Sequence, residues 1–156
     1  APGASVADTR LDQAEIRYAG GGGNAGLSLS RLNYTLADLR LWRNLVGIRA
    51  SGGGTAVIDE SRILENGVGV LAEAGATPRI ERSEISGNTG FGAENRAPAN
   101  VVVARGNWWG HPSGPQDPIA NPAGQGNAVT AGVDYGQFLD GVPLVRCSVR
   151  AENNVY

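Results

Sequence analysis

The chain has 156 residues, the size of one ordinary domain, and its formal net charge of -2 argues against a basic surface for nucleic acid. Its 24 glycines, together with the absence of methionine and lysine, disfavour helices and suit a turn-rich β structure. No apolar run approaches the ~20 residues that a membrane span needs, and the sequence contains no cofactor or metal motif.

The first apolar pair, Leu11 and Ile16, has a spacing that recurs three times along the chain. In each recurrence two aliphatic residues stand five apart, an asparagine follows three positions later, and the pattern returns after 22 residues. The three repeats are Leu36, Leu41 and Asn44; Ile58, Ile63 and Asn66; and Ile80, Ile85 and Asn88. A period in the twenties is typical of a solenoid, whose repeats bury their apolar faces only against their neighbours.

The repeat lengths change at both ends of this pattern. Leu11 to Leu36 is 25 residues, and the excess fits the glycine run 20–23, which we expect to bulge from one corner as an exposed loop. A fifth repeat is less regular. Strict counting sets Val102 beneath Ile80, Asn107 beneath Ile85, and Gly110 beneath Asn88.

Short apolar stretches broken by glycine and asparagine predict strands and turns rather than helices. A helical repeat would need two amphipathic helices per unit, and the closely spaced leucines of a leucine-rich repeat are missing. We therefore predict an all-β fold, a single-stranded parallel β-helix of about five rungs formed by residues 1–105.

Two polar columns have a mechanical interpretation. Stacked rungs lie about 4.8 Å apart, so Asn44, Asn66 and Asn88 can hydrogen-bond to one another along the stack. Ser61 and Ser83 form a shorter column with the same interpretation. The alternative is a polar row that binds a ligand.

Charged residues are expected to point outward in two further columns. One column is Asp38, Glu60 and Arg82, and the other is Arg40, Arg62 and Glu84. Because each column mixes signs, we expect a solvated face that neutralises itself. The alternative is a sugar-binding groove in which Trp42 is a stacking platform rather than a cover for the coil. Its ligand-binding residues would be Trp42, Arg40, Arg62, Glu60 and Glu84.

An enzyme of this architecture would be a polysaccharide lyase or a glycoside hydrolase. A hydrolase needs two carboxylates at a set separation, and a lyase needs clustered acids for Ca²⁺ together with a base. Two carboxylate pairs can be considered, Glu60 with Glu84 and Asp59 with Glu81. The sequence singles out neither pair, so no catalytic residue is predicted and a protein without enzymatic activity is favoured.

One dense motif occupies residues 106–139. It contains Asn-Trp-Trp-Gly at 107–110, Ser-Gly-Pro at 113–115, Asn-Pro-Ala-Gly-Gln-Gly at 121–126 and Val-Asp-Tyr at 133–135. With this motif the chain resembles the right-handed parallel β-helix repeat proteins of bacterial surfaces and secreted enzymes, of pectate-lyase-like architecture. The resemblance implies a right-handed coil closed by a capping loop over 106–139. The group spans enzymes, adhesive modules and surface-layer components, so it implies no single function.

A cap in this position has a physical purpose, because the end of a solenoid exposes apolar core and unpaired strand edges. Trp108 and Trp109 bring large apolar area to the last rung, and the nearby prolines impose a loop. Residues expected to cover the base of the coil are Val133, Tyr135, Phe138 and Leu139. His111, the only histidine, stands where related proteins often carry aspartate, and we expect it to be a surface turn residue.

The chain beyond residue 139 is less informative. Residues 140–156 are predicted to be a tail, an edge strand or a linker, and Cys147 within them is expected to be a small apolar residue. No cap is evident before Leu11, so we expect further rungs or another domain to precede residue 1 in a longer protein.

These patterns together predict a non-enzymatic extracellular or cell-surface module that displays or contacts other molecules. The alternative is a carbohydrate-active β-helix that binds or degrades a polysaccharide. The expected partners are polysaccharides or other cell-surface proteins, with neither nucleic acid nor a membrane span.

Overall fold

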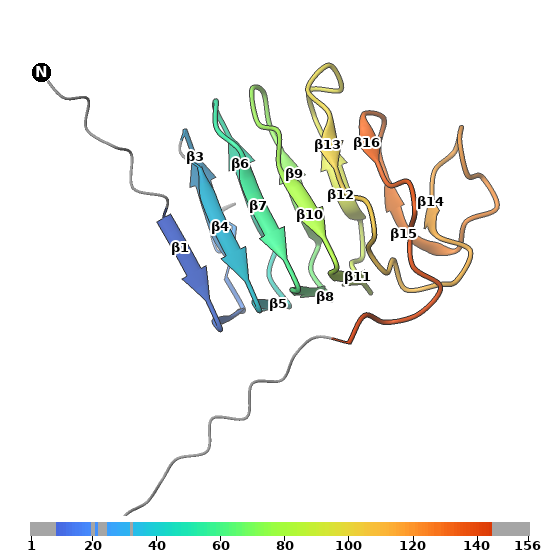
Figure 1. The fold of residues 1–156 in the computed structure, drawn as a ribbon, viewed down its shortest axis with the longest axis horizontal. Coiled ribbons are helices and arrows are strands. Elements are labelled where there is room, and N and C mark those ends of the chain that lie inside the picture. The colour runs from blue at the N-terminus through green and yellow to red at the C-terminus, as the bar shows by residue number, and fades with distance from the viewer. Residues whose placement is uncertain (1–8, 20, 22–24, 32, 145–156) are drawn as a thin grey trace, which may run out of the picture.

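The computed structural model describes residues 9–19, 21, 25–31 and 33–144, and it shows a parallel β-solenoid (Figure 1). Strands of successive turns stack into three parallel sheets. Sheet A contains β1 (Thr9–Asp12), β4 (Tyr34–Ala37), β7 (Ala56–Asp59), β10 (Arg79–Glu81), β13 (Val102–Val103) and β16 (Val133–Asp134). Sheet B contains β2 (Glu15–Arg17), β5 (Arg40–Trp42), β8 (Arg62–Leu64) and β11 (Glu84–Ser86). Sheet C contains β3 (Leu27–Ser30), β6 (Val46–Ser51), β9 (Val68–Ala72), β12 (Phe91–Asn95), β15 (Gly126–Val129) and β14 (Pro115–Gln116).

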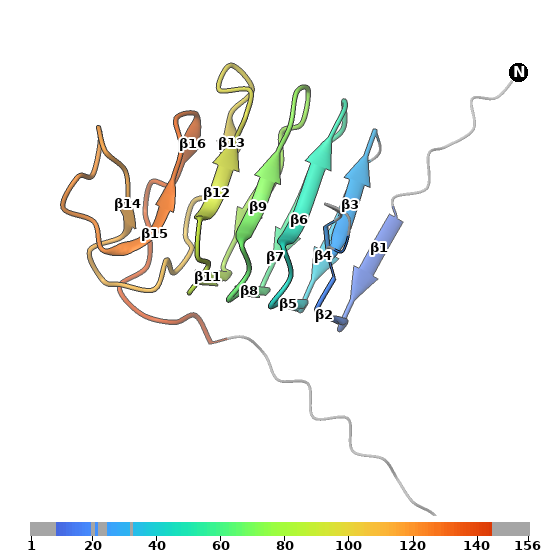
Figure 2. The same ribbon diagram turned by 180° about the vertical axis from the view of Figure 1, so that it is seen from behind.

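Each complete turn of the coil contributes one strand to each sheet. Seen from behind, β3, β6, β9 and β12 lie side by side in turn order (Figure 2). Sheet B has four strands, and in the fifth turn an isolated bridge between Glu84 and Trp108 replaces a strand. The prediction of an all-β parallel β-helix is therefore confirmed, with about four turns rather than five.

The aliphatic residues of the repeat stack in the predicted register. The partners are Leu11, Leu36, Ile58 and Ile80 in sheet A, and Ile16, Leu41, Ile63 and Ile85 in sheet B. From the second turn onward these side chains are at most 1% exposed. Each fully buried side chain of this kind contributes roughly 1.5–3 kcal/mol, so the two columns form the centre of the core.

The strict 22-residue count for the fifth turn is wrong, because the chain gains two residues before it. Ala93 pairs with Val70, 23 residues earlier, and Val103 pairs with Arg79, 24 residues earlier. One extra residue is taken up at the start of β12 and another in the loop before β13.

This change of register reassigns the residues of the fifth turn. Asn107 lies beneath Ser83 rather than Ile85, since the Ser83 backbone N–H donates to Asn107 Oδ1 at 2.9 Å. Trp109, which stands 24 residues after Ile85, is fully buried. Gly110 is not in the asparagine column.

The asparagine column is a hydrogen-bond ladder, as predicted. Asn44 Nδ2 donates to Asn66 Oδ1 at 3.0 Å, and Asn66 Nδ2 donates to Asn88 Oδ1 at 3.0 Å. Asn127 extends the ladder, because its Oδ1 accepts from Asn88 Nδ2 at 2.9 Å. Each amide is thus bonded along the stack to the next turn.

Ser61 and Ser83 belong to a second ladder. The Leu39 N–H donates to Ser61 Oγ at 3.1 Å, and the Ser61 N–H donates to Ser83 Oγ at 3.1 Å. Asn107 completes the series beneath Ser83. A buried polar group left unbonded costs about 1–3 kcal/mol, so these side chains stabilise the corners that they occupy.

Residues 106–139 lie at the C-terminal end of the coil (Figure 1). Trp109 packs so closely that a Cβ built on Gly92 would lie 3.0 Å from its ring. Val133 pairs with Val102 and is 8% exposed, and Phe138 lies against Gly114. Three of the residues predicted to return toward the base therefore do so, since the Leu139 N–H also donates to the Asn107 carbonyl at 2.9 Å. Tyr135 is the fourth, and it packs against the core cluster.

The last described residues extend away from the core, with Val142 50% and Leu144 99% exposed. Cys147 and the rest of the predicted tail lie outside the described residues, as do most of the glycines of the run 20–23. Within the part of the chain that is described, no helix has the length and apolar character of a membrane span.

Candidate functional site

The outer face of sheet B carries four of the five residues predicted to bind a ligand. Arg40, Arg62 and Glu84 are register partners in one column, as predicted, and Glu15 precedes them in the first turn. Trp42 stands two residues after Arg40 in β5. Because side chains alternate along a strand, it points from the same face.

Arginine and aromatic side chains gather around Trp42. We name the residues Arg17, Tyr18, Arg40, Trp42 and Arg43 the Trp42 cluster. The guanidinium carbons of the three arginines lie 5.5, 5.0 and 4.6 Å from the indole centroid in sequence order. The Tyr18 ring lies 5.9 Å away and is tilted by 50°. Each cation–π contact of this kind contributes about 0.5–1 kcal/mol at an exposed site, so the cluster holds the indole in place.

Trp42 is partly buried and already in contact with the chain. Its Nε1 donates to Glu15 Oε1 at 2.9 Å, and three guanidinium groups lie over its ring. These contacts support its interpretation as a cover for the coil. Tyr18, which is 65% exposed, is the aromatic side chain with a large accessible surface.

The charges of the cluster are only partly compensated. Arg17 lies 3.7 Å from Glu15, and Arg43 lies 2.8 Å from Glu65. Arg43 also donates to the Tyr18 hydroxyl at 3.2 Å, and this bond, followed by the Glu65 carboxylate, raises the pKa of Arg43 above its ordinary value. Among the described residues, Arg40 has no carboxylate partner.

Glu60 and Glu84 each lie beside an arginine. Glu84 is 3.7 Å from Arg62 in its own column. Glu60 belongs to the corner between sheets A and B, where its φ of 43° is in the left-handed region, and it lies 3.7 Å from Arg82. The structure therefore places Glu60 at the neighbouring corner, apart from the sheet B column that carries Glu84.

The column predicted from Asp38, Glu60 and Arg82 lies at a corner rather than within a strand. All three residues have positive φ values, of 51°, 43° and 46° respectively. This conformation turns the chain from sheet A into sheet B. The column is thus a row of bends with mixed charge along one edge of the coil.

The second carboxylate pair considered from the sequence is also neutralised. Asp59 and Glu81 are register partners on neighbouring strands of sheet A. Arg82 forms an ion pair with Asp59, and Arg79 forms one with Glu81 at 2.5 Å. Over the described ranges, no group of three or more metal-ligating side chains comes together.

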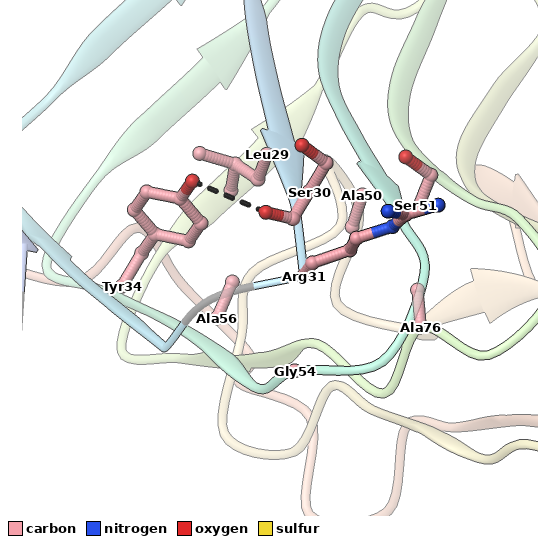
Figure 3. Close-up of a pocket in the computed structure, with 9 residues that line it drawn as sticks. All are labelled: Leu29, Ser30, Arg31, Tyr34, Ala50, Ser51, Gly54, Ala56 and Ala76. Carbon is pink, nitrogen blue, oxygen red and sulfur yellow. Dashed lines mark hydrogen bonds between the residues drawn. The ribbon is translucent and has the colours of Figure 1, made fainter. Parts of the chain in front are cut away.

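Two hollows lie away from sheet B. The first, about 10 Å³ in volume, sits where sheet C turns into sheet A and has room for a single water molecule (Figure 3). Leu29, Arg31, Tyr34 and small side chains from three turns line it. The second, about 470 Å³, lies beside the C-terminal loop and is lined mainly by apolar groups, including Phe91 and Ile119.

Four residues of the sheet B site were not predicted: Glu15, Arg17, Tyr18 and Arg43. The 25-residue offset of the first turn contains the missing signal, because it places Arg17 over Trp42. The same offset sets Tyr18 over Arg43. Applied beyond the aliphatic residues, it would have brought the aromatic and basic side chains together.

The sheet topology and the side-chain ladders define the chain as a parallel β-solenoid protein with a cluster of arginine and aromatic residues on one face. Compared with protein-family models, curated proteins and solved structures, the chain matches none of them.

Proposed function

We propose that the chain is a non-enzymatic β-solenoid module, extracellular or at a cell surface, that binds a partner through the outer face of sheet B. The Trp42 cluster is the observation that carries this proposal. Tryptophan, tyrosine and arginine are the residues most enriched among those that dominate binding energies. Here they project together from one rigid face.

The scaffold supports such a role because its corners are fixed. Two buried ladders join successive turns, so the outer face of sheet B moves little relative to the core. A side chain that is already positioned loses less conformational entropy on binding. The arginines beside Glu60 and Glu84 suit a solvated face better than a pair of catalytic carboxylates.

Two measurements test this proposal. Immobilised protein is probed with a glycan array and a random peptide library, and we expect ligands whose binding is lost on Trp42→Ala but kept on Arg79→Gln, a change on the outer face of sheet A. Catalysis is tested by product release from acidic polysaccharides. Turnover that disappears on Glu60→Gln or Glu84→Gln would show an enzyme and overturn the proposal.

A second candidate is carbohydrate binding. The exposed Tyr18 ring beside Trp42 favours it, because aromatic faces next to hydrogen-bond donors suit sugar rings. Glycan-array binding that is abolished by Tyr18→Ala, with no peptide selected above background, would support this candidate over a protein partner.

A further inference from the structure

On the basis of the function above, we propose that the Trp42 cluster binds an acidic segment of a partner protein. An aspartate or glutamate carboxylate of that segment pairs with Arg40, and a neighbouring apolar side chain packs against Tyr18. The proposal depends on the charge, the geometry and the shape of this face.

Charge gives the first reason. The cluster contains three arginines, and two carboxylates lie beside them, Glu15 near Arg17 and Glu65 near Arg43. Three positive and two negative groups leave one positive charge, located at Arg40. A carboxylate is the single group that would complete this set of pairs.

Geometry gives the second reason. Arg40 lies 5.0 Å from the Trp42 ring centroid, and a guanidinium that contacts a ring keeps its N–H donors for other partners. The fork of donors matches a carboxylate, which it can bind through two parallel hydrogen bonds. Trp42 is itself fixed by its bond to Glu15, so the fork is oriented before the partner arrives.

Shape favours a protein segment over a small molecule. Small-molecule sites are usually concave, whereas these side chains stand on the outer face of a sheet and the two hollows lie elsewhere. Tyr18 and Leu45, 65% and 54% exposed, follow β2 and β5 at the next corner and provide apolar area.

The extent of the positive charge favours a short segment over a long acidic polymer. Along the axis, Trp42 is followed by Leu64 in the next turn, and the column of Arg40 ends at Glu84. A polyanion running along the coil would therefore meet an opposing carboxylate two turns after Arg40. A segment that contacts only the first two turns avoids it.

Selection from a library of random dodecapeptides displayed on phage tests the proposal with the whole chain as bait. We expect enriched sequences to contain aspartate or glutamate next to an aromatic or aliphatic residue. Synthetic copies of the enriched peptides should bind at least about tenfold more weakly to Arg40→Gln. Arg40→Lys keeps the charge but not the fork, so it should recover only part of the affinity.

Matched variants separate the outcomes. Arg79→Gln, on the outer face of sheet A, should leave peptide affinity unchanged, and circular dichroism verifies that each variant is folded. Peptides that depend on Trp42 but are neutral or basic would overturn the acidic partner and leave the proposed function standing. If neither peptides nor glycans depend on Trp42, both proposals fail. Tight binding of an acidic polysaccharide with no peptide enrichment would identify the other class of partner.

Discussion

At the scale of single residues, Asn66 shows how a polar side chain holds a solenoid together. It is fully buried, its Oδ1 accepts from both the backbone N–H and Nδ2 of Asn44, and its Nδ2 donates to Leu41 and Asn88. One side chain thus connects three turns. Removing it leaves donors and an acceptor in a place that water cannot easily reach.

We expect Asn66→Ala to lower the free energy of unfolding by roughly 2–4 kcal/mol, because each buried group left unbonded costs about 1–3 kcal/mol. Urea denaturation followed by circular dichroism measures the change. Asn33→Ala is the matched control, since exposed Asn33 also accepts a backbone N–H, from Thr55, at 3.0 Å. Equal losses in the two variants would contradict a special role for the ladder.

At the scale of elements, the C-terminal segment is held by a close contact with the chain that returns over it. Gly114 has a φ of +77°, and a Cβ built there would lie 2.6 Å from carbons of the Phe138 ring. The position therefore needs glycine both for its backbone conformation and for the space occupied by Phe138.

Gly114→Ala should destabilise the protein by about 1–3 kcal/mol, through left-handed backbone strain and displacement of Phe138. Thermal unfolding measures the effect. Gly53→Ala is the control, because Gly53 has no positive φ and nothing lies within 4 Å of a Cβ built there. An unchanged melting temperature for Gly114→Ala would show that the Phe138 contact is dispensable.

The same C-terminal region contains two carboxylates with lowered pKa values. The backbone N–H groups of Ile119 and Ala120 lower the pKa of Asp117, and Arg105 lowers that of Asp134. A depressed folded pKa contributes stability above the ordinary aspartate value of about 3.9 and loses it as pH falls through the folded value. We expect stability to decline below about pH 4 for this reason.

Fluorescence of the buried Trp109, recorded in urea at pH values from 6 to 2, checks this expectation. Asp117→Asn and Asp134→Asn should each flatten the decline, because the substituted amide does not titrate. Asp140→Asn serves as an exposed control. A decline that is the same in all three variants would assign the acid sensitivity to other groups.

Particular elements show how far the sequence could predict this structure. The strands β4 to β11 follow from a constant 22-residue period, because stacking repeats side chains at equal intervals. The fifth turn does not, since single-residue insertions next to β12 and before β13 change the count without leaving a local signal. Asn127 joins the ladder 39 residues after Asn88, a separation that no short period reveals.

The site was predicted in part for a related reason. The column of Arg40, Arg62 and Glu84 shares the period of the core, so its register could be counted. The contacts among the side chains of the Trp42 cluster depend on rotamers, which periodicity does not determine. The corner position of Glu60 likewise depends on a left-handed backbone conformation that its residue type does not favour.

At the scale of the whole molecule, each turn contacts only the turns above and below it. Stability in such a stack is the sum of what each turn contributes alone and what each pair of neighbours contributes. Ile63 lies between Leu41 and Ile85 and is fully buried. Ile16, in the first turn, is partly buried and has Leu41 as its partner on one side.

We therefore expect Ile63→Ala to lower the free energy of unfolding by about 2–5 kcal/mol, since it leaves a cavity between two packed layers. Ile16→Ala should cost less and act mainly on the first turn. Hydrogen exchange resolved by residue distinguishes the two effects. Ile16→Ala should speed exchange in β1, β2 and β3 alone, because the later turns keep their neighbours, whereas Ile63→Ala should speed exchange on both sides of β8. Uniform acceleration through the whole coil by Ile16→Ala would mean that the turns unfold as one unit rather than as coupled neighbours.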